Sequence, residues 1–215
     1  LPIYTISSVT ITNSDVKLKT ASALTVNASS LTGSSTLQTV AADKDITVSG
    51  AITNNTNANT LTLMAARDIN VNANISGAAG KSLNTYFYAN TDNNGSGGYV
   101  QTSAISTYGG HVVIGGGTND NTAGCAATFS CIAGYANGNT TATAGSAVST
   151  GAYITSTGSI SAAGGNISLY GLGKTTSTTE GDGIRVFGTG GASVLSTTGT
   201  GTITLDGIAT GAWNG

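Results

Sequence analysis

Ionisable side chains are scarce, so any acid–base chemistry must come from a short set of residues. The 215-residue chain holds nine aspartates and glutamates, seven lysines and arginines, and one histidine. General acid–base catalysis needs paired carboxylates or a histidine with a positioned partner. The acidic residues are instead spread along the whole chain, at Asp15, Asp43, Asp45, Asp68, Asp92, Asp120, Glu180, Asp182 and Asp206.

Three aspartates come closest to a carboxylate cluster. Asp43 and Asp45 have the spacing that places two side chains on one strand face. Asp68 is the residue that aligns with Asp45 in the next copy of a repeat described below. A sugar-cleaving enzyme would use such carboxylates. Aspartate before a strand is also a common turn residue. We interpret these residues as turn-closing and expect no catalytic residue and no enzymatic activity.

The remaining polar candidates fit neither a catalytic triad nor a complete metal site. His111 follows two glycines and is interpreted as a polar turn residue, because it has no positioned carboxylate. Glu180 and Asp182 flank Gly181 and are interpreted as loop residues, with a cation site as the alternative. The run Asp92-Asn93-Asn94-Gly95 resembles a calcium loop but lacks a bidentate glutamate, so a turn is favoured and calcium binding stays open. We predict no cofactor and no metal.

Two cysteines and one aromatic cluster complete the candidates. Cys125 and Cys131 are too few for a zinc site and predict a small disulfide loop in an oxidising compartment, with two free thiols as the alternative. In the run Tyr86-Phe87-Tyr88, strand alternation directs Phe87 inward and both tyrosines outward. Tyr86 and Tyr88 are therefore candidate surface contacts for a sugar or a neighbouring chain.

Short repeats set the positions of these residues. The segment from Leu37 matches the segment from Leu61 at an offset of 24 residues, and Asp45-Ile46 matches Asp68-Ile69 at 23. A second module, Ile105-Ser through Gly109-Gly110 to Ile114, recurs without a gap 55 residues later, from Ile160. Looser copies begin at Ile75 and Leu195.

The repeated unit predicts short strands. Each copy holds an aliphatic residue, a serine or threonine, glycine, and a triplet such as Ile167-Ser-Leu169 with period-two alternation. A near-constant repeat of 22 to 24 residues supplies three strands and three turns. The fold class predicted is all-β: a single-stranded right-handed parallel β-helix, a solenoid of about nine or ten rungs with extra-helical loops. Residues 1–215 form one repeat domain, with loop excursions at about 89–99 and 115–147.

Composition excludes several classes of protein. Charged residues make up 7% of the chain and no basic patch is present, which argues against nucleic-acid binding. No apolar run approaches the ~20 residues of a membrane span, and the start shows no signal peptide. Because the repeats begin at once and without a cap, we interpret the chain as a fragment of a longer one.

The segment Leu61 to Ile75 resembles the interior repeats of filamentous haemagglutinin-like exoproteins, which are bacterial adhesins and delivery stalks exported by two-partner secretion. The glycine-rich modules at Gly109 and Gly164 are similar to that group and to autotransporter passengers. The resemblance covers roughly residues 37 to 207. The family's secretion domain carries Asn-Pro motifs, and none occurs here because the only proline is Pro2.

The resemblance implies a structural shaft of a secreted or cell-surface bacterial exoprotein. Its expected role is adhesion or self-assembly into an extracellular filament, and its expected partners are host or surface glycans and proteins, or copies of itself in a homo-oligomer. Ice binding is the first alternative, because triplets such as Thr60-Leu-Thr62 and Thr202-Ile-Thr204 supply threonine pairs. A polysaccharide-degrading β-helix enzyme is the second.

Overall fold

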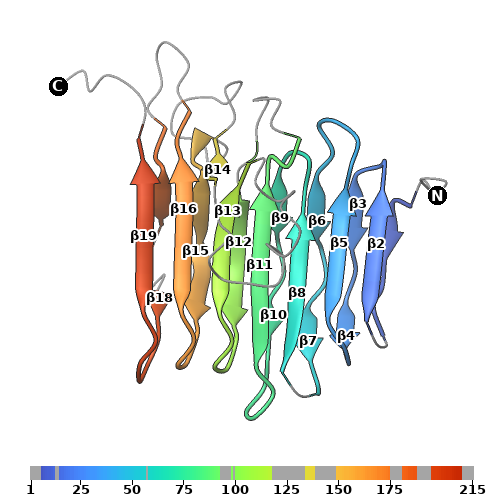
Figure 1. The fold of residues 1–215 in the computed structure, drawn as a ribbon, viewed down its shortest axis with the longest axis vertical. Coiled ribbons are helices and arrows are strands. Elements are labelled where there is room, and N and C mark those ends of the chain that lie inside the picture. Colours follow the sequence, from blue (N-terminus) through green and yellow to red (C-terminus); the bar gives the residue numbers. More distant parts are fainter. Residues whose placement is uncertain are drawn as a thin grey trace.

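The computed structural model describes residues 6–12, 15–56, 58–92, 98, 100–117, 134–138, 149–174, 181–187 and 195–209. Their strands form one sheet of 11 strands and one of 8, and every strand pair in both sheets is parallel (Figure 1). The predicted all-β fold is confirmed: the two sheets are the walls of a parallel β-helix of about nine rungs. The right-handed sense of the coil stays a prediction, which the strong general preference for right-handed crossovers supports.

We call the 8-stranded sheet the front sheet and the 11-stranded sheet the back sheet. The front sheet contains β2 (Val16–Thr20), β5 (Ser35–Thr39), β8 (Asn59–Met64), β11 (Leu83–Ala89), β13 (Val112–Gly116), β14 (Ala136–Asn137), β16 (Ile167–Leu172) and β19 (Ile203–Ile208). The back sheet contains β1 (Ser8–Val9), β3 (Leu24–Val26), β4 (Ser29–Leu31), β6 (Ile46–Val48), β7 (Ile52–Asn54), β9 (Ile69–Val71), β10 (Ile75–Ser76), β12 (Val100–Ser106), β15 (Ala152–Ser161), β17 (Ile184–Val186) and β18 (Leu195–Ser196).

The strand register confirms most of the predicted repeat and corrects one part of it. Ile46 pairs with Ile69 at the predicted offset of 23, and Ile105 pairs with Ile160 at the predicted offset of 55. Leu37, however, pairs with Leu63 and not with Leu61. A shift of two residues leaves every side chain on the same face of a strand, so alternation alone could not exclude the wrong register.

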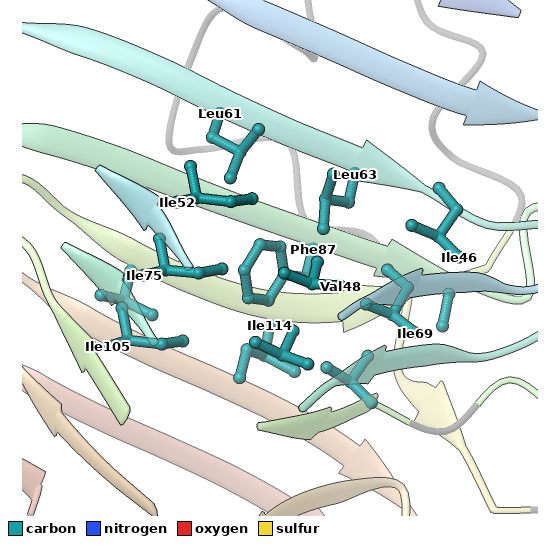
Figure 2. Packing of buried hydrophobic residues seen from close by; sticks show 14 of the residues in the cluster. Ile46, Val48, Ile52, Leu61, Leu63, Ile69, Ile75, Phe87, Ile105 and Ile114 are labelled. Atoms are coloured by element: carbon teal, nitrogen blue, oxygen red, sulfur yellow. The ribbon is translucent and has the colours of Figure 1, made fainter. Parts of the chain in front are cut away.

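The core consists of aliphatic side chains stacked in columns between the two sheets. One column runs through Leu37, Leu63, Phe87 and Ile114, each of them 0% exposed. Figure 2 shows Phe87 between Leu63 and Ile114 in this column, next to Ile75 of the back sheet. Burying such a side chain contributes about 1.5–3 kcal/mol to the free energy of folding. A single coil has too little apolar area to fold alone, and the stack is stable because each coil covers its neighbours.

Glycines allow the turns between coils to approach closely. A Cβ atom on Gly110 would overlap the carbonyl group of Leu83, and one on Gly165 would overlap the carbonyl oxygen of Gly110. The Gly-Gly pairs of the repeated module therefore keep consecutive coils at strand spacing, about 4.8 Å.

Part of the predicted excursion at 115–147 belongs to the sheets. β13 extends to Gly116, and β14 pairs with the second half of β16 through Ala136 and Gly171. At the other predicted excursion, at 89–99, Asp92 lies in a turn after β11.

Candidate functional site

The densest group of charges lies where the chain enters two neighbouring back-sheet strands. Asp45 directly precedes β6 and Asp68 directly precedes β9, and the backbone N–H of Ile46 donates to the Asp68 carbonyl at 2.9 Å. The two aspartates therefore lie one coil apart, as the sequence repeat predicts. Between them Arg67 makes a two-pronged contact with Asp45, from Nε to Oδ1 at 2.8 Å and from a terminal nitrogen to Oδ2 at 2.7 Å.

Asp68 is the most enclosed acid in this group, with 4% of the residue exposed. Its Oδ2 lies 3.4 Å from Arg67 Nε, and its Oδ1 accepts the backbone N–H of Gly98 at 2.7 Å. The Asp68 N–H in turn donates to Asp45 Oδ1 at 3.1 Å. Both carboxylates are thus bonded to a guanidinium and to backbone donors by charge-assisted hydrogen bonds, which are stronger than neutral ones.

The ion pairs and hydrogen bonds of this group connect two neighbouring coils, which is a structural role. The hydrogen bond to Asp45, together with the charges of Asp45, Asp68 and Asp43, raises the pKa of Arg67 above its ordinary value despite partial burial. A carboxylate that acts as a general acid or base must present an oxygen to the substrate, and the oxygens of Asp45 and Asp68 face protein donors. Among the described residues, no cluster of three or more His, Cys, Asp or Glu side chains is arranged to hold a metal ion.

Asp43 does not share a strand face with Asp45, which corrects the sequence prediction. It lies in a turn before β6, with a positive φ of 56° that is incompatible with a strand. Its N–H donates to Asp92 Oδ2 at 3.3 Å, across 49 residues of sequence. This contact supports the interpretation of these aspartates as turn residues.

A ladder of polar side chains runs along the front sheet, near the start of its strands, and is interrupted between Thr60 and Asn84, where the Asn84 side-chain amide donates to Thr60 Oγ1 at 3.4 Å. In each step a side chain on one coil accepts a hydrogen bond from the backbone N–H of the residue stacked on the next coil. The donor and acceptor pairs are Ser34 N to Asp15 Oδ1 at 2.7 Å, Thr60 N to Ser34 Oγ at 3.1 Å, His111 N to Asn84 Oδ1 at 2.9 Å, Asn166 N to His111 Nδ1 at 2.9 Å, and Thr202 N to Asn166 Oδ1 at 3.0 Å. We call this set the acceptor ladder.

His111 has a structural role in the acceptor ladder. Since Nδ1 accepts the N–H of Asn166, the ring is neutral and its proton is on Nε2. Burial lowers the pKa of His111 below its ordinary value, which favours the same neutral form. The sequence alignment of His111 with Asn166 predicted a polar turn residue, and both side chains do serve as acceptors here.

A row of hydroxyl groups on the back sheet was present in the repeat pattern but was not recognised as a surface feature. From Thr53 onward the serine or threonine follows an inward-facing aliphatic residue, and Ser30 follows the buried Ser29, so each hydroxyl residue faces outward on its coil. The paired residues are Ser30, Thr53, Ser76, Ser106, Ser161 and Ser196, all partly exposed. Strand spacing places these hydroxyl residues about 4.8 Å apart. We call this set the hydroxyl row.

The aromatic cluster on β11 is only partly as predicted. Phe87 points into the core and is 0% exposed, whereas Tyr86 and Tyr88 face away from it. Tyr86 nevertheless has only 6% of its surface exposed, which corrects the expectation of an exposed ring, while Tyr88 is partly exposed. Burial also raises the pKa of Tyr86 above its ordinary value. Their role in contacting a partner stays a prediction.

Several predicted features lie outside the described residues. These are the disulfide between Cys125 and Cys131, Glu180, and the part of the calcium-like run after Asp92. Asp182 is described, and its Oδ2 lies 3.9 Å from Arg185 Nε, a distance typical of a weak ion pair.

Comparisons with known proteins give no relative. No protein-family model, no curated protein and no solved structure matches this chain. In the described ranges there is also no helix with the length and apolar character needed to cross a membrane.

Proposed function

We propose that this chain is a structural shaft of a bacterial secreted or cell-surface exoprotein that acts in adhesion or in assembly of an extracellular filament. The observation that carries the proposal is the unbroken set of core columns. Side chains such as Leu37 on β5, Phe87 on β11 and Leu169 on β16 are 0% exposed in the inner coils along the stack. A scaffold of this kind holds its outer faces rigid over a long distance, which is what a stalk requires.

The outer faces support a role in contact with other surfaces. The hydroxyl row offers evenly spaced donors and acceptors on a back sheet that carries few charges. Hydroxyl-rich, weakly charged surfaces suit hydrogen bonding to the hydroxyl groups of glycans or to neighbouring proteins. The resemblance of residues 61–75 to filamentous haemagglutinin-like repeats points the same way, towards a location outside the bacterial cell.

Polysaccharide cleavage receives less support from the geometry. The acids nearest to each other, Asp45 and Asp68, are bonded to Arg67 and to backbone N–H groups. Ice binding also receives less support, because Thr62 is 2% exposed and Tyr86 and Val113 follow it in the same outward column. A flat ice-binding face would need threonine pairs on consecutive coils.

The experiment is an adhesion assay with the purified chain on a glycan array and on immobilised bacterial and host cells. The test variant replaces Ser106 and Ser161 in the hydroxyl row by glutamate. The control variant replaces Thr25 and Thr47, two partly exposed stacked residues on another column of the back sheet, in the same way. We expect adhesion by the parent and the control, and at least a tenfold loss in the test variant, which corresponds to about 1.4 kcal/mol. A chain that neither adheres to any surface nor assembles would contradict the proposal, and thermal hysteresis would favour ice binding.

A further inference from the structure

One step of the acceptor ladder depends on a group that can gain a proton in mild acid. The step connects the turn before β13 to the turn before β16, and its acceptor is His111 Nδ1, which lies 2.9 Å from the backbone nitrogen of Asn166. His111 is the only histidine in the chain. Histidine is the one side chain whose unperturbed charge changes between pH 5 and 8.

The neighbouring steps use acceptors that do not titrate. The N–H of His111 donates to Asn84 Oδ1 at 2.9 Å, and the N–H of Thr202 donates to Asn166 Oδ1 at 3.0 Å. Amide oxygens keep both lone pairs in mild acid. The strand register stacks Asn84, His111 and Asn166 on three consecutive coils. Histidine therefore occupies a place at which asparagine serves on the coil before and on the coil after.

Protonation changes this step from an attraction to a repulsion. The neutral ring with its proton on Nε2 has a lone pair on Nδ1, whereas the charged ring has a proton on both nitrogens and accepts nothing. Its Nδ1–H would point at the N–H of Asn166, and two donors repel each other. The ring then has to turn away, and the N–H of Asn166 must take an acceptor from water.

The surroundings of His111 contain no carboxylate that would hold a charged ring in place. The relevant elements are the turns at 77–82, 107–111 and 162–166 and the strands that follow them, β11, β13 and β16. Their ionisable residues besides His111 are Lys81, Tyr86, Tyr88, Tyr108 and Tyr170. None of these contributes to the lowered pKa of His111, which burial causes. A nearby carboxylate would have favoured the charged form.

We infer that His111 is an acid-sensitive joint between the coil of β13 and the coil of β16, whose two turns are held together by the neutral ring and open when the ring is protonated. The backbone bonds on either side do not involve the ring: Thr107 N–H donates to the Ser161 carbonyl at 2.9 Å, and Val112 N–H to the Asn166 carbonyl at 2.8 Å. The opening is therefore local and reversible. It goes beyond the proposed shaft function, because it gives the coil a loose point that forms only in acid.

The test uses the complete 215-residue chain without a histidine tag, so that His111 gives the only histidine ring signals. Nuclear magnetic resonance follows the ring nitrogens and the exchange of backbone amides between pH 8 and pH 5, with each exchange rate divided by its intrinsic rate. At pH 8 we expect a neutral ring with its proton on Nε2. As the ring becomes charged, the protection of the Asn166 N–H should fall roughly tenfold or more.

A matched amide and two substitutions separate the acceptor from other effects of acid. The Thr60 N–H, held by Ser34 Oγ at 3.1 Å on a distant step, should change in protection by less than about twofold. His111→Asn supplies an amide oxygen like those of Asn84 and Asn166, so Asn166 should stay protected at both pH values. His111→Phe keeps a ring without an acceptor, so Asn166 should exchange at pH 8 as it does in the acidified parent. Circular dichroism establishes that each variant is folded, and His111→Asn is decisive if His111→Phe is not.

Four results would overturn the inference. They are a ring proton on Nδ1 at pH 8, Asn166 protection that does not follow the charge of the ring, pH dependence that persists in His111→Asn, and an equal loss of protection at Thr60. The shaft function has a separate readout, because adhesion at pH 8 requires no titration of His111. Loss of the joint would leave that adhesion in place, and a chain that does not adhere could still open at Asn166 in acid.

Discussion

Replacing Thr102 by valine should make the protein more stable, although it removes a hydroxyl group from a chain rich in serine and threonine. Thr102 lies in β12 with 0% exposure, and its hydroxyl has no hydrogen-bond partner. Its neighbours in the same inner column are Val71 and Ile154, both 0% exposed. A buried hydroxyl without a partner costs about 1–3 kcal/mol relative to water. Valine has the same branched shape, keeps the strand preference and adds a methyl group of about 0.8 kcal/mol to the core.

We expect the free energy of unfolding to rise by about 1–2 kcal/mol in Thr102→Val, after allowing for imperfect packing of the new methyl group. For a domain of this size the melting temperature then rises by roughly 2–8 °C. The assay is urea unfolding followed by circular dichroism. The midpoint should move to higher urea with an unchanged slope, because the surface exposed on unfolding is nearly the same.

Thr39→Val is the matched control. Thr39 is also 0% exposed, but its hydroxyl donates to the Lys44 carbonyl at 2.9 Å and accepts the Ala66 N–H at 2.9 Å. The same substitution here should lower stability by about 1–3 kcal/mol. A lower urea midpoint in both variants would refute the reasoning, because it would mean that the Thr102 hydroxyl is also bonded in solution.

Three further predictions concern the contacts between coils. Arg67→Ala should cost roughly 2 kcal/mol in urea unfolding, less than a fully buried pair, because it leaves Asp68 enclosed without its cation. Because burial lowers the pKa of His111, the neutral ring contributes its full stabilisation at pH values above the ordinary pKa of 6.5. This contribution is lost as the pH falls through the lowered pKa of the folded protein. His111→Asn removes the titrating group and should therefore flatten the pH dependence of the urea midpoint between pH 5 and 7. Gly165→Ala should lower the melting temperature by several degrees, from about 1–3 kcal/mol of overlap with Gly110, measured by thermal unfolding against the parent.

The sequence predicts the coil best where a repeat contains residues that only one register accepts. The module at Ile105 and Ile160 was aligned correctly because its glycine pairs stand at turns where a Cβ atom would overlap the next coil. The repeat at Leu37 was aligned two residues out of register, with Leu61 in place of Leu63. The strands of this repeat alternate apolar and polar residues but contain no glycine that only one register accepts. A shift of two residues leaves the alternation unchanged, so the sequence pattern does not exclude it.

The candidate site was predictable in its members but not in its contacts. The repeat placed Asp45 and Asp68 on neighbouring coils, but nothing in the spacing indicated that Arg67 would bind both. An arginine adjacent to a stacked aspartate is the one signal that could have suggested it. For Tyr86, alternation gives the side of the sheet to which a residue points, whereas its 6% exposure depends on what covers that side.

The columns that stabilise the inner coils also make each coil depend on its neighbours. An inner strand such as β8 has both edges bonded, to β5 and to β11, and its inward residues Leu61 and Leu63 are 0% exposed. Leu63 packs between Leu37 and Phe87 in one column. A smaller residue at Leu63 would therefore remove contacts from two neighbouring coils at once, and neither coil has enough apolar area to replace them alone.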